Sequence, residues 1–172
     1  MGNKQTQKVL VVDDEEPILE LLKYNLEKSG YEVRTASDGM KAIDIAKKFI
    51  PDLVLLDIKT WDPERHLKLT GQNIGPTLDF ARRLAARKRP VWLRFVLVPG
   101  LTDNVNDIAQ IAQFAAVLGN IERVCVLPFH QMGLFKWKKL GLDYTLQDVE
   151  SPSNDLVERT CALFRAEGLT AD

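Results

Sequence analysis

Short apolar segments alternate with segments of helical periodicity along most of the chain. The first, Lys8 to Asp14 (KVLVVDD), is rich in β-branched residues and ends in carboxylates, which is typical of a buried parallel strand. Pro17 then suits the first turn of a helix, whose apolar residues recur at helical spacing until Gly30 ends it. Four further strands are predicted at residues 31–36, 52–58, 90–98 and 121–129.

The remaining helices are predicted from the same periodicity. Ser37 or Asp38 can cap the second helix, and the pattern turns Met40, Ile43 and Ala46 inward. Three more helices are predicted over residues 76–88, 103–118 and 155–167. Two stretches do not fit the alternation: residues 59–75 are polar and predicted to be irregular, and residues 130–153 are too long for an ordinary connection.

The alternation of strands and helices predicts an α/β fold with one doubly wound parallel sheet and right-handed crossovers. A chain of 172 residues with 45% hydrophobic content can bury the core of one domain. A partial βα barrel is the alternative arrangement of the same elements. The pattern therefore predicts the class of fold and leaves these two architectures open.

Charge and cysteine content exclude several classes of function. Lys plus Arg (23) nearly balances Asp plus Glu (24), so no basic surface indicates nucleic-acid binding. No apolar run approaches the ~20 residues that a membrane helix needs. Two distant cysteines, Cys125 and Cys161, without metal-type spacing favour a reducing compartment. We expect a cytoplasmic protein.

Carboxylates end two of the predicted strands. Asp13 and Asp14 close the first strand and Asp57 closes the third, and parallel neighbours end at the same edge of a sheet. Clustered carboxylate oxygens are the ligands that a hard cation such as Mg²⁺ prefers. The simpler interpretation is that these acids only solvate strand ends. The alternative to a metal is Lys59, which follows Asp57 closely enough to enter the pocket as an internal counter-ion.

Residues 8–58 resemble the receiver domain of bacterial response regulators from end to end. The resemblance implies a flavodoxin-like, five-stranded sheet in the order 2-1-3-4-5 with helices on both faces. It also implies that Asp13 and Asp14 bind Mg²⁺ and that Asp57 accepts a phosphoryl group. Receivers end the fourth strand with a hydroxyl residue and the fifth with lysine, whereas this chain has Phe95 and Leu127 there. The switch residues of the family are therefore missing.

From about residue 52 the chain is similar to another family. LLDIKTWDPERHLKLTG, VWLRFVLVPGLTDN and LGNIERVCVLPFHQMGLFKWKKLGLDY resemble the C-terminal half of pyruvate formate-lyase activating enzyme, a radical S-adenosylmethionine enzyme. The resemblance implies that Lys59, Arg94 and His130 line a cofactor pocket. Taken singly, residues at such positions are ordinarily solvated.

The iron–sulfur chemistry of the second family is not expected here. The family holds a 4Fe–4S cluster with three cysteines in a Cys-x3-Cys-x2-Cys loop, and that loop belongs to the half that this chain lacks. Cys125 and Cys161 cannot replace it, because cluster ligands must converge on one small volume. We therefore expect no cluster and no S-adenosylmethionine binding, and we interpret Lys59, Arg94 and His130 as remnants of a cofactor pocket.

The strand LLD at residues 55–57 fits both families, which places the seam near residues 52–59. We interpret residues 1–172 as a single chimeric domain that was engineered from a receiver half (1–57) and an activase half (58–172). The expected function is at most residual divalent-metal binding at Asp13, Asp14 and Asp57, with no enzymatic activity. Phosphoryl acceptance by Asp57 and activity as a radical S-adenosylmethionine fragment are the alternatives. No partner is implied, and a homodimer stays open.

Overall fold

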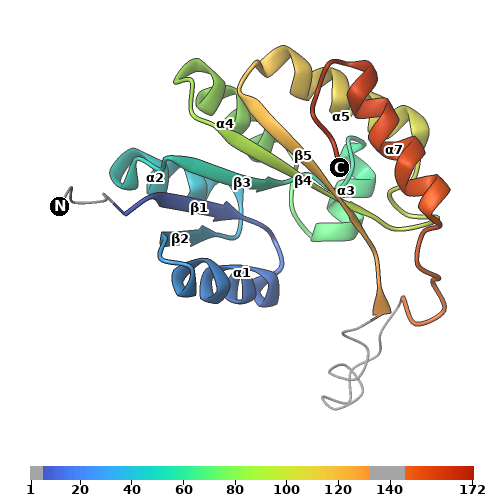
Figure 1. Ribbon diagram of the computed structural model, residues 1–172, viewed down its shortest axis with the longest axis horizontal. Coiled ribbons are helices and arrows are strands. Elements are labelled where there is room, and N and C mark those ends of the chain that lie inside the picture. The colour runs from blue at the N-terminus through green and yellow to red at the C-terminus, as the bar shows by residue number, and fades with distance from the viewer. Residues whose placement is uncertain (1–5, 132–145) are drawn as a thin grey trace.

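The computed structural model describes residues 6–131 and 146–172. Their strands form one five-stranded sheet in the order β2-β1-β3-β4-β5 (Figure 1). The strands are β1 (Lys8–Val12), β2 (Glu32–Ala36), β3 (Leu53–Asp57), β4 (Val91–Leu97) and β5 (Ile121–Pro128). Every pairing is parallel. The order and the parallel pairing together confirm the predicted flavodoxin-like sheet.

Helices cover both faces of the sheet, but unequally (Figure 1). They are α1 (Glu16–Lys28), α2 (Gly39–Phe49), α3 (Pro63–Thr70), α4 (Gly75–Ala86), α5 (Val105–Leu118) and α7 (Asn154–Ala166). Leu19 of α1 packs with Val9 and Val11 on one face. The larger cluster on the other face takes its side chains from α2, α4, α5 and α7. In the described part of the chain, no helix is long and apolar enough to cross a membrane.

The two parts of the chain meet along β3 and β4 in the middle of the sheet. Their register pairs Val54 with Val91 and Asp57 with Arg94. Because paired residues of parallel strands project to the same face, Arg94 stands beside Asp57 at the carboxyl end of the sheet. The sheet therefore continues without a break from the residues that resemble a receiver into those that follow.

A second contact between the two parts joins the beginnings of α2 and α4. A Cβ atom placed on Gly39 would lie 2.3 Å from the carbonyl oxygen of Pro76, a separation that real Cβ atoms do not show. The glycine lets the two helices approach backbone to backbone. This close approach is a packing requirement that periodicity does not reveal.

Two predictions about local structure were wrong. Residues 59–75 are not irregular throughout, since α3 forms within them: Asp62 accepts a hydrogen bond from the Arg65 amide at its start, and Gly71 ends it. The helix is mostly polar, so its periodicity is weak. Met40 does not face the core, because its side chain is 62% exposed whereas Ala42 takes the inward position. The predicted connection 130–153 lies largely outside the described residues.

Candidate functional site

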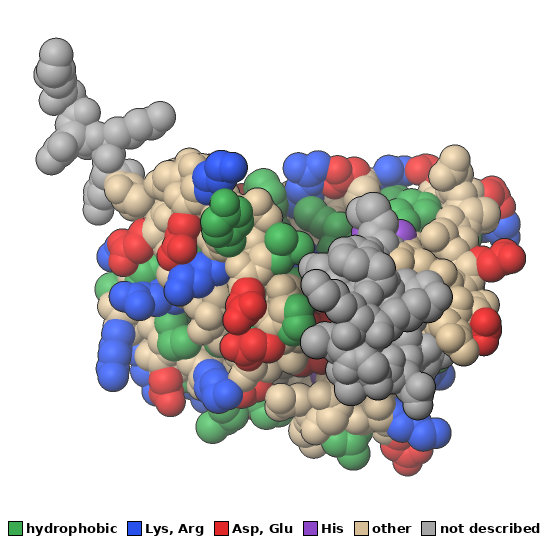
Figure 2. Space-filling model, turned by 90° about the horizontal axis from the view of Figure 1, so that it is seen from below, with side chains coloured by type: hydrophobic (Ala, Val, Ile, Leu, Met, Phe, Trp, Pro, Cys, Tyr) green, Lys and Arg blue, Asp and Glu red, His purple; other side chains and the backbone are tan. Residues whose placement is uncertain are grey.

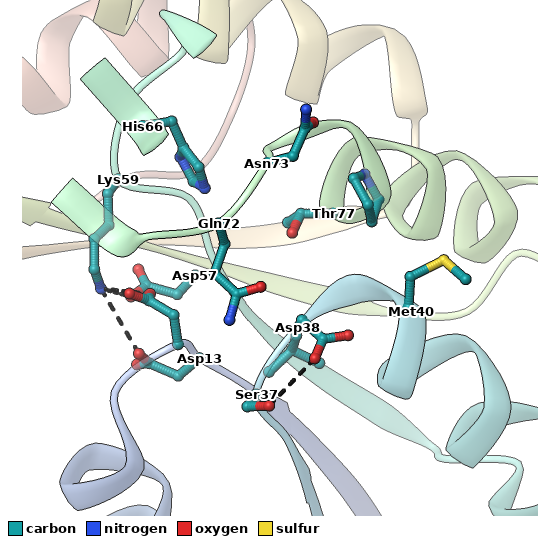
Figure 3. Close-up of a pocket in the computed structure, with 13 residues that line it drawn as sticks. Asp13, Ser37, Asp38, Met40, Asp57, Lys59, His66, Gln72, Asn73 and Thr77 are labelled. Carbon is teal, nitrogen blue, oxygen red and sulfur yellow. Dashed lines mark hydrogen bonds and ion pairs between the residues drawn. The ribbon is translucent and has the colours of Figure 1, made fainter. Parts of the chain in front are cut away.

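Three carboxylates converge at the carboxyl edge of the sheet (Figure 3). Asp13 follows β1 and Asp57 ends β3, and these strands are neighbours, so their ends lie together as the sequence predicted. Asp13 is 3% exposed and Asp57 is 7% exposed, whereas Asp14 is half-buried. One oxygen from each of the three residues lies within 4.8 Å of the others. The arrangement is a set of hard oxygen donors around one small volume.

The ammonium group of Lys59 lies among these carboxylates (Figure 3). Its Nζ is 2.7 Å from Asp57 Oδ2, 3.1 Å from Asp14 Oδ1 and 3.7 Å from Asp13 Oδ1. Glu15 adds a fourth carboxylate at 3.1 Å. The Lys59 side chain is 11% exposed, so its contacts with the three aspartates lie largely out of solvent, whereas the Glu15 side chain is 55% exposed. The alternative in which Lys59 enters the pocket as a counter-ion is therefore the arrangement in this structure.

A second cation approaches from the neighbouring strand. Arg94 Nη1 donates to Asp13 Oδ2 over 2.9 Å, and the arginine side chain is 12% exposed. The register that pairs Arg94 with Asp57 directs the guanidinium to this face of the sheet. Four carboxylates thus meet two cations, which leaves the pocket with an excess of negative charge when all are ionised.

Burial and the neighbouring charges shift the pKa values of Asp13 and Lys59. Burial and the nearby Asp57 carboxylate raise the pKa of Asp13, although Lys59, the Glu15 amide and Arg94 act to lower it. Burial alone would lower the pKa of Lys59, but its carboxylate neighbours, with Asp57 foremost, raise it above its ordinary value. The lysine is therefore held as a charged ammonium, and carboxylates surround this positive charge.

Two buried polar atoms near the pocket have no hydrogen-bond partner within the described residues: Asp57 Oδ1 and His66 Nδ1. Both residues line a cavity of about 170 Å³ beside Lys59. Burial lowers the pKa of His66, although Asp14 acts in the other direction, so its imidazole is neutral near pH 7. An unsatisfied buried oxygen normally indicates a missing partner such as water or an ion. Within the described residues, Asp57 thus retains one carboxylate oxygen that no hydrogen bond uses.

Asp107 of α5 anchors the segment that carries Lys59. Its buried carboxylate accepts from the Thr60 hydroxyl, from the Asp62 amide at 3.0 Å and from Arg65 Nη1 at 3.0 Å. Thr60 directly follows Lys59, so these bonds fix the main chain next to the pocket. This anchor could not be predicted from the sequence, because no local pattern links residues that are more than forty positions apart.

The other predicted residues fall in different places. Lys59 and Arg94 are largely buried, which corrects the expectation for such residues taken singly: Lys59 lies among carboxylates, and Arg94 pairs with Asp13. His130 is exposed at the end of β5 and is not among the residues that line the cavity. The structure therefore brings two of the three expected cofactor-pocket remnants together with the acidic residues and leaves the third outside.

The switch positions of a receiver carry apolar side chains here. Phe95 is fully buried and packs edge to face on Phe164, with ring centroids 5.8 Å apart, on the sheet face opposite Arg94. Leu127 pairs with Val96 farther along β4. The cysteines lie on separate elements, Cys125 on β5 and Cys161 on α7. Among the described residues, neither cysteine joins a group of three metal-ligating side chains.

Comparisons with known sequences divide the chain as its motifs do. A family model of the response regulator receiver domain matches residues 9–60. Pyruvate formate-lyase-activating enzyme from Listeria monocytogenes is 44% identical over 108 residues, which are 63% of this chain and 44% of that enzyme. The enzyme from Staphylococcus aureus is 47% identical over 107 residues, 62% of this chain and 43% of the enzyme. The chain spans less than half the length of these curated relatives.

Solved structures show the same fold. A domain of pyruvate-formate lyase-activating enzyme from Bacteroides vulgatus aligns over 94% of this chain and 96% of its own, with a TM-score of 0.67 and 21% identity. Chemotaxis protein CheY4 from Vibrio cholerae aligns over 80% of this chain and 99% of its own, with a TM-score of 0.51 and 22% identity. The chain therefore has a CheY-like fold and is similar in sequence to two families.

Proposed function

We propose that this chain is an engineered hybrid of two α/β folds that keeps no complete catalytic apparatus and retains the capacity to hold a divalent cation at Asp13, Asp14 and Asp57. The observation that carries the proposal is the convergence of one oxygen from each residue within 4.8 Å. These are hard donors on rigid strand ends, and Mg²⁺ takes one or two such carboxylates and keeps several waters. In the part of the chain that the structure describes, Asp57 Oδ1 is also a buried carboxylate oxygen without a hydrogen-bond partner.

We expect no enzymatic activity, because each part lacks residues that its resemblance implies for catalysis. The resemblance to the activating enzymes implies a cluster-binding loop with three cysteines, whereas the whole chain contains two. Bound Mg²⁺ would neutralise carboxylate charge and carry water ligands at the pocket. Asp13, Asp14 and Asp57 would hold the ion in place.

Phosphoryl acceptance by Asp57 is the less favoured function. A transferring phosphoryl group needs cations and hydroxyl donors fixed around its oxygens. Phe95 and Leu127, which stand where the receiver resemblance implies a hydroxyl residue and a lysine, supply neither. The geometry therefore favours cation binding over phosphoryl chemistry at this pocket.

A thermal melt with and without Mg²⁺ tests the proposal. Mg²⁺ that binds only the folded state raises its stability by mass action. For a weak site at millimolar Mg²⁺ we expect about 1 kcal/mol, which raises Tm by about 2–4 °C in a chain of this size. Asp57→Asn should lose the response. The matched control Asp44→Asn removes an exposed carboxylate from α2 and should keep it.

Two results would contradict cation binding at this pocket. One is a folded parent protein that shows no change in Tm with Mg²⁺. The other is an equal rise in the parent and in Asp57→Asn, because that response would come from another part of the surface.

A further inference from the structure

The Lys59 ammonium occupies the volume that a cation bound by these carboxylates would need (Figure 3). Its Nζ contacts all three carboxylates of the candidate site, at 2.7, 3.1 and 3.7 Å. An ammonium and a hydrated metal ion cannot share such a volume, and their like charges repel each other strongly where solvent is excluded. Any divalent cation must therefore displace the lysine side chain.

The Lys59 ammonium does not form hydrogen bonds with all the carboxylate oxygens of the candidate site. Asp57 is 7% exposed, and its Oδ1 is buried without a hydrogen-bond partner in the described ranges. Lys59 contacts the other oxygen of the same carboxylate. A lysine has three donor hydrogens, and it meets four carboxylates here, so some of their oxygens remain free.

The surroundings of Lys59 allow its side chain to leave while its main chain stays in place. Asp107 fixes the following residues through Thr60, Asp62 and Arg65. The cavity of about 170 Å³ lies directly beside the lysine and opens among polar side chains of the segment after α3, including Gln72 and Asn73. A long aliphatic stem can turn its charged end toward solvent through such an opening.

We infer that Lys59 is a tethered competitor for the cation site, so that its ammonium sets how weakly the pocket binds divalent metal. The inference rests on the proposed function, since it concerns the same carboxylates. Its consequence is that removal of the lysine charge strengthens metal binding. Mg²⁺ in turn releases the lysine side chain from the pocket.

The first experiment is a calorimetric Mg²⁺ titration of the parent and of Lys59→Met, which keeps the apolar stem and removes the charge. We expect the dissociation constant to fall at least tenfold, which corresponds to about 1.4 kcal/mol. Lys47→Met is the matched control, because Lys47 is an exposed lysine on α2 and its loss should leave the constant unchanged. The double variant Lys59→Met, Asp57→Asn should lose most of the gain.

The outcomes separate this inference from the proposed function. Equal Mg²⁺ affinity in the parent and in Lys59→Met overturns the competition and leaves cation binding intact. Binding by Lys59→Met without detectable binding by the parent supports the competition and overturns cation binding by the unaltered pocket. A folded Lys59→Met protein that does not bind Mg²⁺ overturns both.

A second measurement on the unaltered protein covers the case in which Lys59→Met does not fold. An amine-reactive reagent should modify Lys59 slowly in metal-free buffer, because its side chain is only 11% exposed. Saturating Mg²⁺ should accelerate this modification several-fold and leave Lys47 unchanged, as read by peptide mass spectrometry. An unchanged rate at Lys59 under Mg²⁺ saturation would overturn the inference.

Discussion

The inner strands of the receiver-like part, β1 and β3, and the strands of the part that follows differ in how they are buried. In β1 and β3, four of five residues are buried in succession, because the chain covers both faces of these strands. In β4, buried and half-buried residues alternate, and β5 follows a similar pattern toward its end. Alternation with period two is typical of strands that pack a helical layer on one face only.

The helices explain the difference. The receiver-like part places α1 on one face and α2 on the other, whereas α4, α5 and α7 all contribute to the same core cluster. A layer of helices on one side of parallel strands is the arrangement of a βα barrel, in which every helix lies outside. In the described residues, helices therefore cover both faces of the inner strands in the receiver-like part and mainly one face in the part that follows, although both parts contribute to one sheet.

This one-sided pattern also accounts for Arg94. On the less covered face of β4 a charged side chain is tolerated, and there it reaches Asp13 over 2.9 Å. On the opposite face the neighbouring Phe95 is fully buried. The acidic pocket comes from the receiver-like part, and both of its cations come from the residues that follow.

The largest expected effect is at the close contact between the two parts. Gly39→Ala places a methyl group 2.3 Å from the Pro76 carbonyl oxygen, so α2 and α4 must move apart. We expect a loss of about 1–3 kcal/mol in the free energy of unfolding, measured by urea denaturation. Lys47→Ala, on the exposed face of the same helix, should change it by less than about 0.5 kcal/mol.

The sign of the Gly39→Ala effect is informative. If the two helices did not touch as in this structure, alanine would stabilise the helix by up to about 1 kcal/mol relative to glycine. A more stable variant would therefore show that the two parts do not pack in this way.

A smaller effect is expected at matched helix caps, one in each part. Asp38 accepts from the Lys41 amide at 2.8 Å at the start of α2, and Asn104 accepts from the Asp107 amide at 3.1 Å at the start of α5. Replacement of either residue with alanine should cost about 1 kcal/mol. If the parts unfold together, both variants shift the same transition. An effect on the signals of one part alone would show that the two parts unfold separately.

The two caps should differ in their response to pH. Although burial acts to raise it, the pKa of Asp38 is lowered below its ordinary value of 3.8, with the hydrogen bond from the Lys41 amide the largest opposing cause. A depressed pKa in the folded state means that the contribution is present above pH 3.8 and is lost as the pH falls through the folded-state value. The cost of Asp38→Ala should therefore shrink in acid, and the cost of Asn104→Ala should stay constant.

Much of the fold could be predicted from the sequence. The five strands and their order followed from apolar runs and from the resemblance of residues 8–58 to receivers, and Asp13, Asp14 and Asp57 were predicted to meet because parallel neighbours end at one edge. The helix α3 was missed because few of its residues are apolar, although Asp62, Pro63 and Gly71 mark its ends. Local capping signals were present there without periodicity.

Other features of the site depend on long-range contacts and could not be predicted. The register of β3 and β4 decides that Arg94 and not Phe95 faces the pocket, and a shift of one residue would exchange them. The anchor at Asp107 joins residues that no local pattern connects. Lys59 was recognised as an alternative occupant, but only the packed structure shows its distances to the carboxylates.

The most direct test of the claim that two parts form one sheet is urea denaturation followed in both parts at once. Amide NMR signals of β4 and β5 report the second part, and those of β1 and β2 report the first. A shared sheet predicts one cooperative transition with the same midpoint for both signals. Separate midpoints, with one part unfolding while the other keeps its signals, would contradict the claim that the two parts form one sheet.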